Sequence, residues 1–184
     1  MNVSEKIMKK IFSFDAETNG LWGQPFSIAV LVYDENGKET ARFVGRCPIE
    51  GEVDGFVAEK VLPQMEGIKE SHDSYGSLLS DFAEFYLREK KDATVIAHMA
   101  IPVESGLLRD MHSREVIGDW DGPFPLIDIS GCLDQAGEDP TSCDGYANKH
   151  GVAVDPAEFA GGTHNPLFDS AQAAAVYRHL LGRR

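Results

Sequence analysis

The sequence predicts an α/β protein in which a mixed β-sheet is flanked by helices. An apolar strand is followed by two strand-like segments joined by a tight turn, which is typical of three antiparallel strands. Farther along the chain, helical periodicity alternates with short apolar strands, as in sheets that are covered by helices. The chain has 184 residues, enough for one domain with a substantial core. We therefore expect a single domain over residues 1–184.

The first three strands are predicted from apolar runs that are bounded by turn residues. Ile7 to Glu17 reads as a strand entering the core, and Pro25 to Tyr33 as a second, apolar strand. The turn at residues 34–37 connects this strand to a third one over Lys38 to Arg46. The short connection favours an antiparallel pair.

The remaining elements alternate between helices and short strands. Ser77 to Lys90 has apolar side chains at helical spacing, and Asn165 to Leu181 is a closing helix rich in alanine. Between them we expect a strand at Thr94 to His98, a helix at Pro102 to Met111 and a strand at Pro125 to Ile129. Ligand sites in such sheets tend to lie at the strand ends.

The charge balance limits how this chain can interact with a polyanion. It has 30 acidic and 17 basic residues and a net charge of −13. A protein that coats nucleic acid needs a basic surface, because phosphate contacts supply most non-specific affinity, so we exclude that class. Solubility alone would explain the acidity. An acidic protein can still process nucleic acid if metal ions neutralise the active centre and few nucleotides are held.

The sequence also bears on location. It contains no run of eighteen apolar residues and begins with a polar, mixed-charge segment, so we expect neither a membrane span nor a secretory signal. Cys47, Cys132 and Cys143 are widely spaced and form no zinc-binding pattern. We interpret them as reduced thiols in a cytoplasmic protein with no membrane partner.

Two carboxylates occur at the end of the first predicted strand. Asp15 and Glu17 are two residues apart and share one face, whereas Phe12, Phe14 and Ala16 face the core. Carboxylates on one face of an otherwise buried strand repel each other unless a cation or water satisfies them. A hard divalent ion with oxygen ligands would do so. For this pair alone, a strand end emerging into solvent is the simpler interpretation.

A histidine and an aspartate flank the start of the last predicted helix. Asn165 is a good N-cap and Pro166 suits the first helical position, which makes Asp169 the fourth helical residue. We expect the side chains of His164 and Asp169 to meet across the helix start, as paired side chains do in a hydrophobic staple. The helix dipole favours the ionised form of Asp169. A structural or solvated histidine explains this segment alone equally well.

Together, these segments resemble the DEDDh 3′–5′ exonucleases, which include proofreading exonucleases, ribonuclease T and oligoribonuclease. Residues 14–21 look like the family's first motif, an Asp-x-Glu-Thr followed by Gly-Leu, and residues 164–169 match the third, a His, four residues and an Asp. Val95 to His98 leads into the second motif, and residues 127–129 and 146–152 resemble the strand and helix that join motifs two and three. The resemblance covers nearly the whole chain and implies a ribonuclease H-like fold.

The second motif departs from the family pattern, which usually has an Asn and then an Asp at the start of the next helix. Glu104 precedes a pair of leucines by the spacing that the family Asp would have, and Pro102 can open the helix. We therefore assign Glu104 to this role. Met99 stands where an Asn is common, and Asp110 on the same helix is the alternative acid.

The resemblance implies hydrolysis of phosphodiester bonds at a nucleic-acid 3′ end with two divalent ions, Mg²⁺ or Mn²⁺. His164 would be the general base, and Asp15 would bridge the two ions. The implied metal ligands are four carboxylates: Asp15, Glu17, Glu104 and Asp169. Contacts to the terminal nucleotide would come from Thr18, Asn19 and Leu21.

Other functions are compatible with the sequence. The acidic charge favours small substrates, so a phosphodiesterase of short oligonucleotides or modified nucleotides is one alternative. The altered second motif permits a degenerate module that binds nucleic-acid ends without cutting, and an interaction protein with incidental carboxylates is a third interpretation. The expected partners are DNA or RNA 3′ ends, short or single-stranded. A homodimer is compatible with the resemblance, because members of the family are often dimers.

Overall fold

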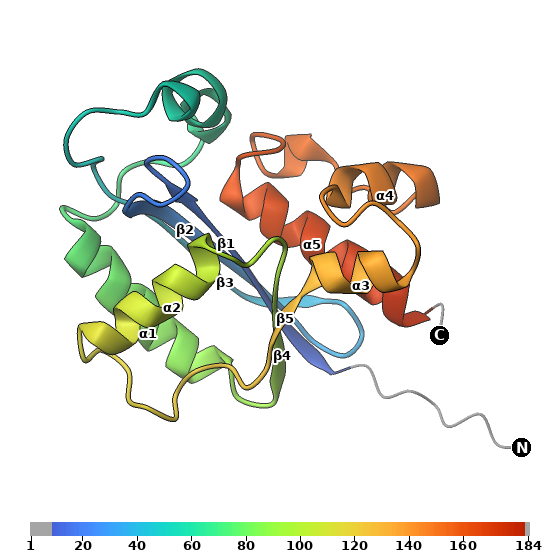
Figure 1. Cartoon of the computed structure of the whole chain (residues 1–184). Coiled ribbons are helices and arrows are strands. Elements are labelled where there is room, and N and C mark those ends of the chain that lie inside the picture. Colours follow the sequence, from blue (N-terminus) through green and yellow to red (C-terminus); the bar gives the residue numbers. More distant parts are fainter. Residues whose placement is uncertain (1–8, 183–184) are drawn as a thin grey trace, which may run out of the picture.

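The computed structural model describes residues 9–182, which form a five-stranded mixed sheet with helices on both faces (Figure 1). The strand order is β3-β2-β1-β4-β5. The strands are β1 (Lys10–Thr18), β2 (Pro25–Tyr33), β3 (Glu39–Arg46), β4 (Ala93–Ala97) and β5 (Leu126–Asp128). The first three are antiparallel, and β4 and β5 continue the sheet in parallel with β1. The predicted sheet architecture is therefore confirmed.

The helices divide into two groups that cover opposite faces of the sheet (Figure 1). The helices are α1 (Tyr75–Glu89), α2 (Val103–Ser113), α3 (Ile129–Gln135), α4 (Cys143–His150) and α5 (Pro166–Gly182). Three short helical segments complete the structure: η1 (Val57–Val61), η2 (Leu62–Met65) and η3 (Pro156–Glu158). No helix in the described part of the chain is long and apolar enough to cross a membrane.

The alternation of side chains along β1 builds both cores. Phe12 and Phe14 point to the face that α1 and α2 cover, whereas Ile11 packs among side chains of α3, α4 and α5. On this second face, the buried hydroxyl of Ser13 donates to the carbonyl of Ser170 in α5, at 2.7 Å. Because α5 buries several small side chains in its middle turns, Ser170, Ala171, Ala173 and Ala174, it lies close to β1. This close approach brings the first turn of α5 to the acidic end of β1.

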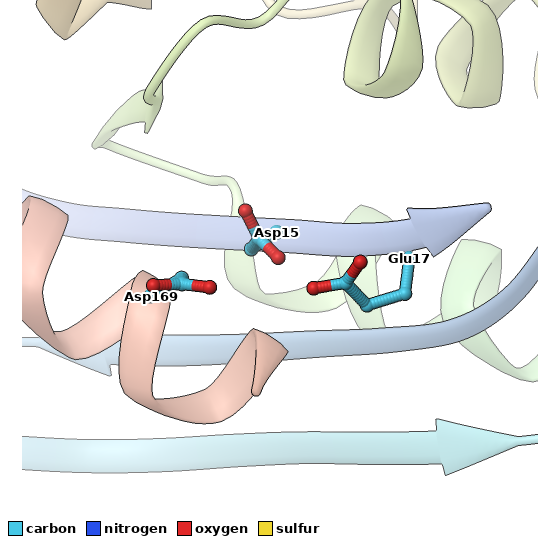
Figure 2. Close-up of side chains that lie close together, drawn as sticks. All are labelled: Asp15, Glu17 and Asp169. Carbon is cyan, nitrogen blue, oxygen red and sulfur yellow. The ribbon is translucent and has the colours of Figure 1, made fainter. Parts of the chain in front are cut away.

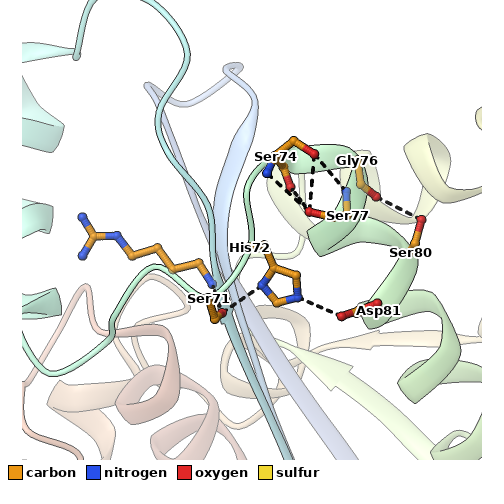
Figure 3. A network of polar contacts seen from close by, with 8 residues as sticks. Ser71, His72, Ser74, Gly76, Ser77, Ser80 and Asp81 are labelled. Carbon is orange, nitrogen blue, oxygen red and sulfur yellow. Dashed lines mark hydrogen bonds and ion pairs between the residues drawn. The ribbon is translucent and has the colours of Figure 1, made fainter.

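The predicted boundaries agree with the structure to within a few residues, and β2 agrees at both ends. The first predicted strand begins earlier than β1, but Ile7 and Met8 lie outside the described residues. Helix α1 begins before the predicted Ser77 because Ser74 caps it: each of these serines accepts a hydrogen bond from the backbone N–H of the other (Figure 3). His72 precedes this cap, with one ring nitrogen 2.8 Å from the Ser71 hydroxyl and the other 3.1 Å from Asp81 (Figure 3).

The segment between β3 and α1 holds structure that the sequence pattern does not predict. Its helical turns η1 and η2 bury Val57, Val61 and Met65 in the core on the α1 face. The segment lies beside the loop that joins β1 to β2 (teal and blue in Figure 1). It therefore borders the end of β1 that carries the acidic pair.

Candidate active site

The end of β1 and the start of α5 bring three carboxylates together. Asp15 and Glu17 lie on the face of β1 that α5 covers, and Asp169 lies in the first turn of α5. Oxygen atoms of the three side chains all lie within 4.8 Å of one another (Figure 2). Three of the four predicted ligands thus form one half-buried cluster from segments more than 150 residues apart.

Glu104 approaches the same strand from the opposite helix layer. It lies in the first turn of α2 and is only 3 % exposed, and its Oε1 accepts a hydrogen bond from the backbone N–H of Ala16 at 3.2 Å. Its carboxyl group is therefore held at the residue between Asp15 and Glu17. Asp110, the alternative acid, instead accepts a hydrogen bond from the hydroxyl of Tyr75 in α1, at 3.0 Å.

Burial and mutual repulsion disfavour the ionised state of this group of carboxyls. Burial raises the pKa of Asp15 well above its usual range, and Asp169, Glu104 and Glu17 raise it further. The pKa of Glu17 is raised by burial and then by Asp169 and Glu104. Burial also raises the pKa of Glu104 to about 8 and that of Asp169 to about 7. A divalent cation would relieve this cost, and an all-carboxylate donor set suits a hard ion such as Mg²⁺ or Mn²⁺.

His164 contacts Asp169, but not in the way the sequence suggests. Its backbone N–H donates to Oδ2 of Asp169 at 2.8 Å, and its φ of 72° places the residue in the left-handed region. The expected contact between the two side chains is therefore wrong, because the turn directs the backbone at the carboxylate. The imidazole instead packs edge-on against Phe56, with ring centroids 5.4 Å apart. Burial lowers the pKa of His164, so its ring is neutral near pH 7 and can accept a proton.

Asn165 is the predicted N-cap of α5, and the structure confirms this role. Its Oδ1 accepts hydrogen bonds from the backbone N–H groups of Leu167 and Phe168 at 3.1 and 3.4 Å. Phe168 is buried in the core and is not available to stack on a base. The cap fixes where α5 begins and hence where Asp169 points.

The three residues expected to contact the terminal nucleotide lie in different environments. Thr18 is almost buried at the end of β1, and the side chain of Leu21 is 64 % exposed. The side chain of Asn19 is engaged with the protein: its Nδ2 donates to the carbonyl of Glu52, and its Oδ1 accepts from the backbone N–H of Asp54. Asn19 therefore connects the loop after β1 to the segment that leads into η1.

Sequence reasoning missed the contribution of Asp128, which it treated only as part of a connecting strand. Its carboxylate accepts hydrogen bonds from the backbone N–H groups of Met99, Ala100 and Ser130, at 3.1, 3.1 and 2.9 Å. Asp128 thereby holds the loop that leads into α2 and carries Glu104. The sequence could have indicated Asp128 as the N-cap of α3, but it gives no indication of the hydrogen bonds to the distant loop before α2.

Comparisons with known proteins show the fold. No family model matches the chain, and no curated protein matches its sequence. The chain is similar to solved structures of E. coli exonuclease I in complex with a dA16 oligonucleotide (TM-score 0.60, 13% identity, 95% of this chain and 41% of that chain). It is also similar to the ExoI/SSB-Ct complex (TM-score 0.58, 12% identity, 96% of this chain and 42% of that chain). A third similar structure is E. coli exonuclease I in complex with a 5cy-dA13 oligonucleotide (TM-score 0.55, 15% identity, 95% of this chain and 40% of that chain).

These similarities confirm the predicted fold class, a ribonuclease H-like exonuclease fold. The chain spans about two fifths of the length of the exonuclease I chains that it matches. At this level of identity, the similarity concerns the fold alone.

Proposed function

We propose that this protein is a metal-dependent 3′–5′ exonuclease of the DEDDh type and that residues 1–184 form one exonuclease domain. The observation that carries the proposal is the convergence of carboxylates from β1, α2 and α5 beside His164. The fold that the chain shares with exonuclease I supports it, and in this structure β1, α2 and α5 bring these side chains to one place.

The carboxylates provide the donor set for two divalent ions, Mg²⁺ or Mn²⁺. Asp15, Glu17 and Asp169 would hold the ions from the α5 side of β1, and Glu104 would contribute from the α2 side. Two ions bound there would supply a water of lowered pKa and stabilise negative charge on the leaving oxygen. Without a cation, the four carboxyls resist ionisation, which is the physical reason to expect one.

The remaining roles belong to residues around the carboxylates. His164 would accept the proton of the attacking water, since burial keeps its imidazole neutral near pH 7. Thr18 and Leu21 would contact the terminal nucleotide, with Asn19 fixing the loop on which Leu21 stands. Single-stranded DNA or RNA is the proposed substrate. The acidity of the chain and the oligonucleotides bound in the exonuclease I structures support this choice.

Cleavage of end-labelled strands tests the proposal. DNA and RNA oligonucleotides labelled at either the 5′ or the 3′ end are incubated with Mg²⁺, Mn²⁺ or EDTA. We expect a 5′-labelled strand to shorten stepwise and a 3′-labelled strand to release labelled mononucleotide at once, with no products in EDTA. Asp15→Asn is the inactive control. Full activity in EDTA, or release of the 5′ label first, would contradict the proposal, whereas binding of ends without cleavage would indicate an end-binding module.

A further inference from the structure

The loops around the carboxylates expose an unusual number of large apolar side chains. Among residues 9–182, nine large hydrophobic side chains are exposed, and six of them lie in three short loops at this end of the sheet. We call these six the apolar rim: Leu21, Trp22, Val53, Phe56, Met99 and Ile101. Trp22 is 81 % exposed and Ile101 is 74 % exposed, so neither is part of the core. Apolar side chains gathered on a surface in this way mark a binding site.

Each of the three loops is attached to a residue of the candidate site. The loop with Leu21 and Trp22 follows Glu17 at the end of β1, and the loop with Met99 and Ile101 leads into the first turn of α2. Phe56, in the third loop, contacts the imidazole of His164. The rim therefore borders the carboxylates on several sides.

The rim is held in place by hydrogen bonds, so its exposure does not reflect a loose chain. Asp54 accepts from the backbone N–H of Phe56 at 2.8 Å, and its own N–H donates to the Asn19 side chain at 2.8 Å. Gln64, which follows η1, accepts at its carbonyl from Asn165 and at its side chain from the N–H of Gly162. Phe56 thus stands fixed between the loop after β1 and the start of α5, and a fixed aromatic surface loses little entropy on binding.

The rim carries no positive charge. Residues 19–24, 51–56 and 98–102 contain no Lys or Arg, and they include Glu52 and Asp54. Two cations, Arg109 and Arg114, line an adjoining cavity of about 480 Å³ together with Trp22 and Ile101. A strand crossing the three loops would therefore find aromatic and aliphatic surface for its bases, and the adjoining cavity offers cationic partners for about two phosphates.

We propose that the apolar rim binds the unpaired bases at the end of a single strand and that phosphate contacts contribute little to recognition. This inference rests on the proposed function and adds the mode of substrate recognition to it. Every base has an apolar face that can stack on an aromatic ring, whereas a duplex keeps those faces covered. A rim without cations would thus select unpaired ends through their bases.

The two tryptophans of the chain allow binding to be measured without cleavage. Trp120 is exposed beside Phe124, outside the rim, so Trp120→Phe leaves Trp22 as the only tryptophan. In a Trp120→Phe, Asp15→Asn protein, Trp22 fluorescence is titrated with a single-stranded oligonucleotide, with the same strand lacking its three terminal bases, and with a blunt duplex. We expect saturable quenching by the first ligand and at least about tenfold weaker binding of the other two.

Salt dependence separates base recognition from phosphate recognition. With two phosphate contacts, raising the salt from about 50 to 200 mM should weaken binding by about sevenfold or less, whereas six contacts would weaken it by about 300-fold. Equal binding of the abasic strand, or the steep salt dependence, would overturn the proposal.

Steady-state cleavage by otherwise wild-type protein provides the second readout. Trp22→Ala should raise KM about tenfold for a single-stranded oligonucleotide, and the matched exposed variant Trp120→Ala should not. An unchanged KM in Trp22→Ala would refute base binding by the apolar rim and leave the exonuclease proposal intact. Base-dependent binding by a protein that cleaves no nucleic acid would support the rim and refute the exonuclease proposal.

Discussion

At the residue scale, His164 offers a clear separation of roles, because only its backbone contacts the carboxylate Asp169. Removing the imidazole should therefore leave metal binding intact. We expect His164→Ala to lower kcat by about 10²–10⁴-fold, the usual contribution of a general base, while Mg²⁺ still raises Tm. Asp15→Asn should lose both the activity and the Tm shift. His112→Ala, at an exposed histidine of α2, is the matched control. If His164→Ala cleaved at the wild-type rate across neutral pH, His164 would not be the general base and would have only a structural role at the start of α5.

Glu104 and Asp169 should make the metal-free protein less stable as pH rises. Burial raises the pKa of Glu104 from 4.5 to about 8 and that of Asp169 from 3.8 to about 7. As pH rises, the unfolded chain loses these protons at a lower pH than the folded state does. The free energy of unfolding therefore falls between the unfolded-state pKa and the folded-state pKa of each carboxyl. We expect Tm in EDTA to fall from about pH 5 to about pH 8.

The variant Glu104→Gln tests this pH dependence, because the amide keeps the shape and cannot ionise. Its Tm in EDTA at about pH 8 should exceed the wild-type value by at least about 2–4 °C, the equivalent of about 1 kcal/mol. Its nuclease activity should be severely impaired. Asp110→Asn, on the same helix, should keep the wild-type pH slope and activity. If instead Asp110→Asn is inactive and Glu104→Gln is active, the second carboxylate has been assigned to the wrong residue.

At the scale of elements, the position of α2 depends on Asp128, a residue of β5. Its carboxylate is the acceptor for two backbone N–H groups of the loop that precedes α2. Asp128→Ala leaves the N–H of Ala100 without its acceptor and the N–H of Met99 with only the Ser130 hydroxyl, which should cost about 2 kcal/mol and lower Tm by about 4–8 °C. Because Glu104 follows this loop, kcat should also fall, even at temperatures where the variant is folded. Asp128→Asn should recover part of kcat, and Asp134→Ala, an exposed acid of α3, should change neither quantity. A loss of Tm with unchanged kcat would limit Asp128 to a structural role.

At the scale of the whole molecule, a chain with a net charge of −13 gathers three carboxyls in one cluster and holds Glu104 at the residue between two of them, so a divalent ion should stabilise it. We expect Mg²⁺ and Mn²⁺ to raise Tm, since a ligand of the folded state stabilises that state, and the gain should be larger at about pH 8 than at about pH 5. Differential scanning fluorimetry measures both, with NaCl at matched ionic strength as the control for general screening. Cleavage with Mn²⁺ should equal or exceed cleavage with Mg²⁺, because Mg²⁺ demands stricter geometry and the longer Glu104 must reach it. An equal Tm gain from NaCl would argue against a specific site.

The sequence by itself determined the features that depend on near neighbours. Alternation along β1 placed Asp15 and Glu17 on one face, and Asn165 with Pro166 located the start of α5, because strand alternation and helix capping involve residues a few positions apart. The order of strands and helices then indicated the fold. Boundaries such as that of α1 shifted by two residues, since a capping serine competes with the apolar periodicity that predicted Ser77.

Only the tertiary structure decided the contacts between distant segments. That Glu104 and not Asp110 reaches β1, that Asp128 holds the loop before α2, and that Phe56 packs on His164 all depend on how separate elements pack. Residues 47–70 carry no periodic signal, because their apolar side chains enter the core from short, irregular turns. The sequence spacing suggests that the side chains of His164 and Asp169 meet. In the structure, His164 adopts a left-handed backbone conformation at the start of α5, and its backbone N–H contacts Asp169 instead.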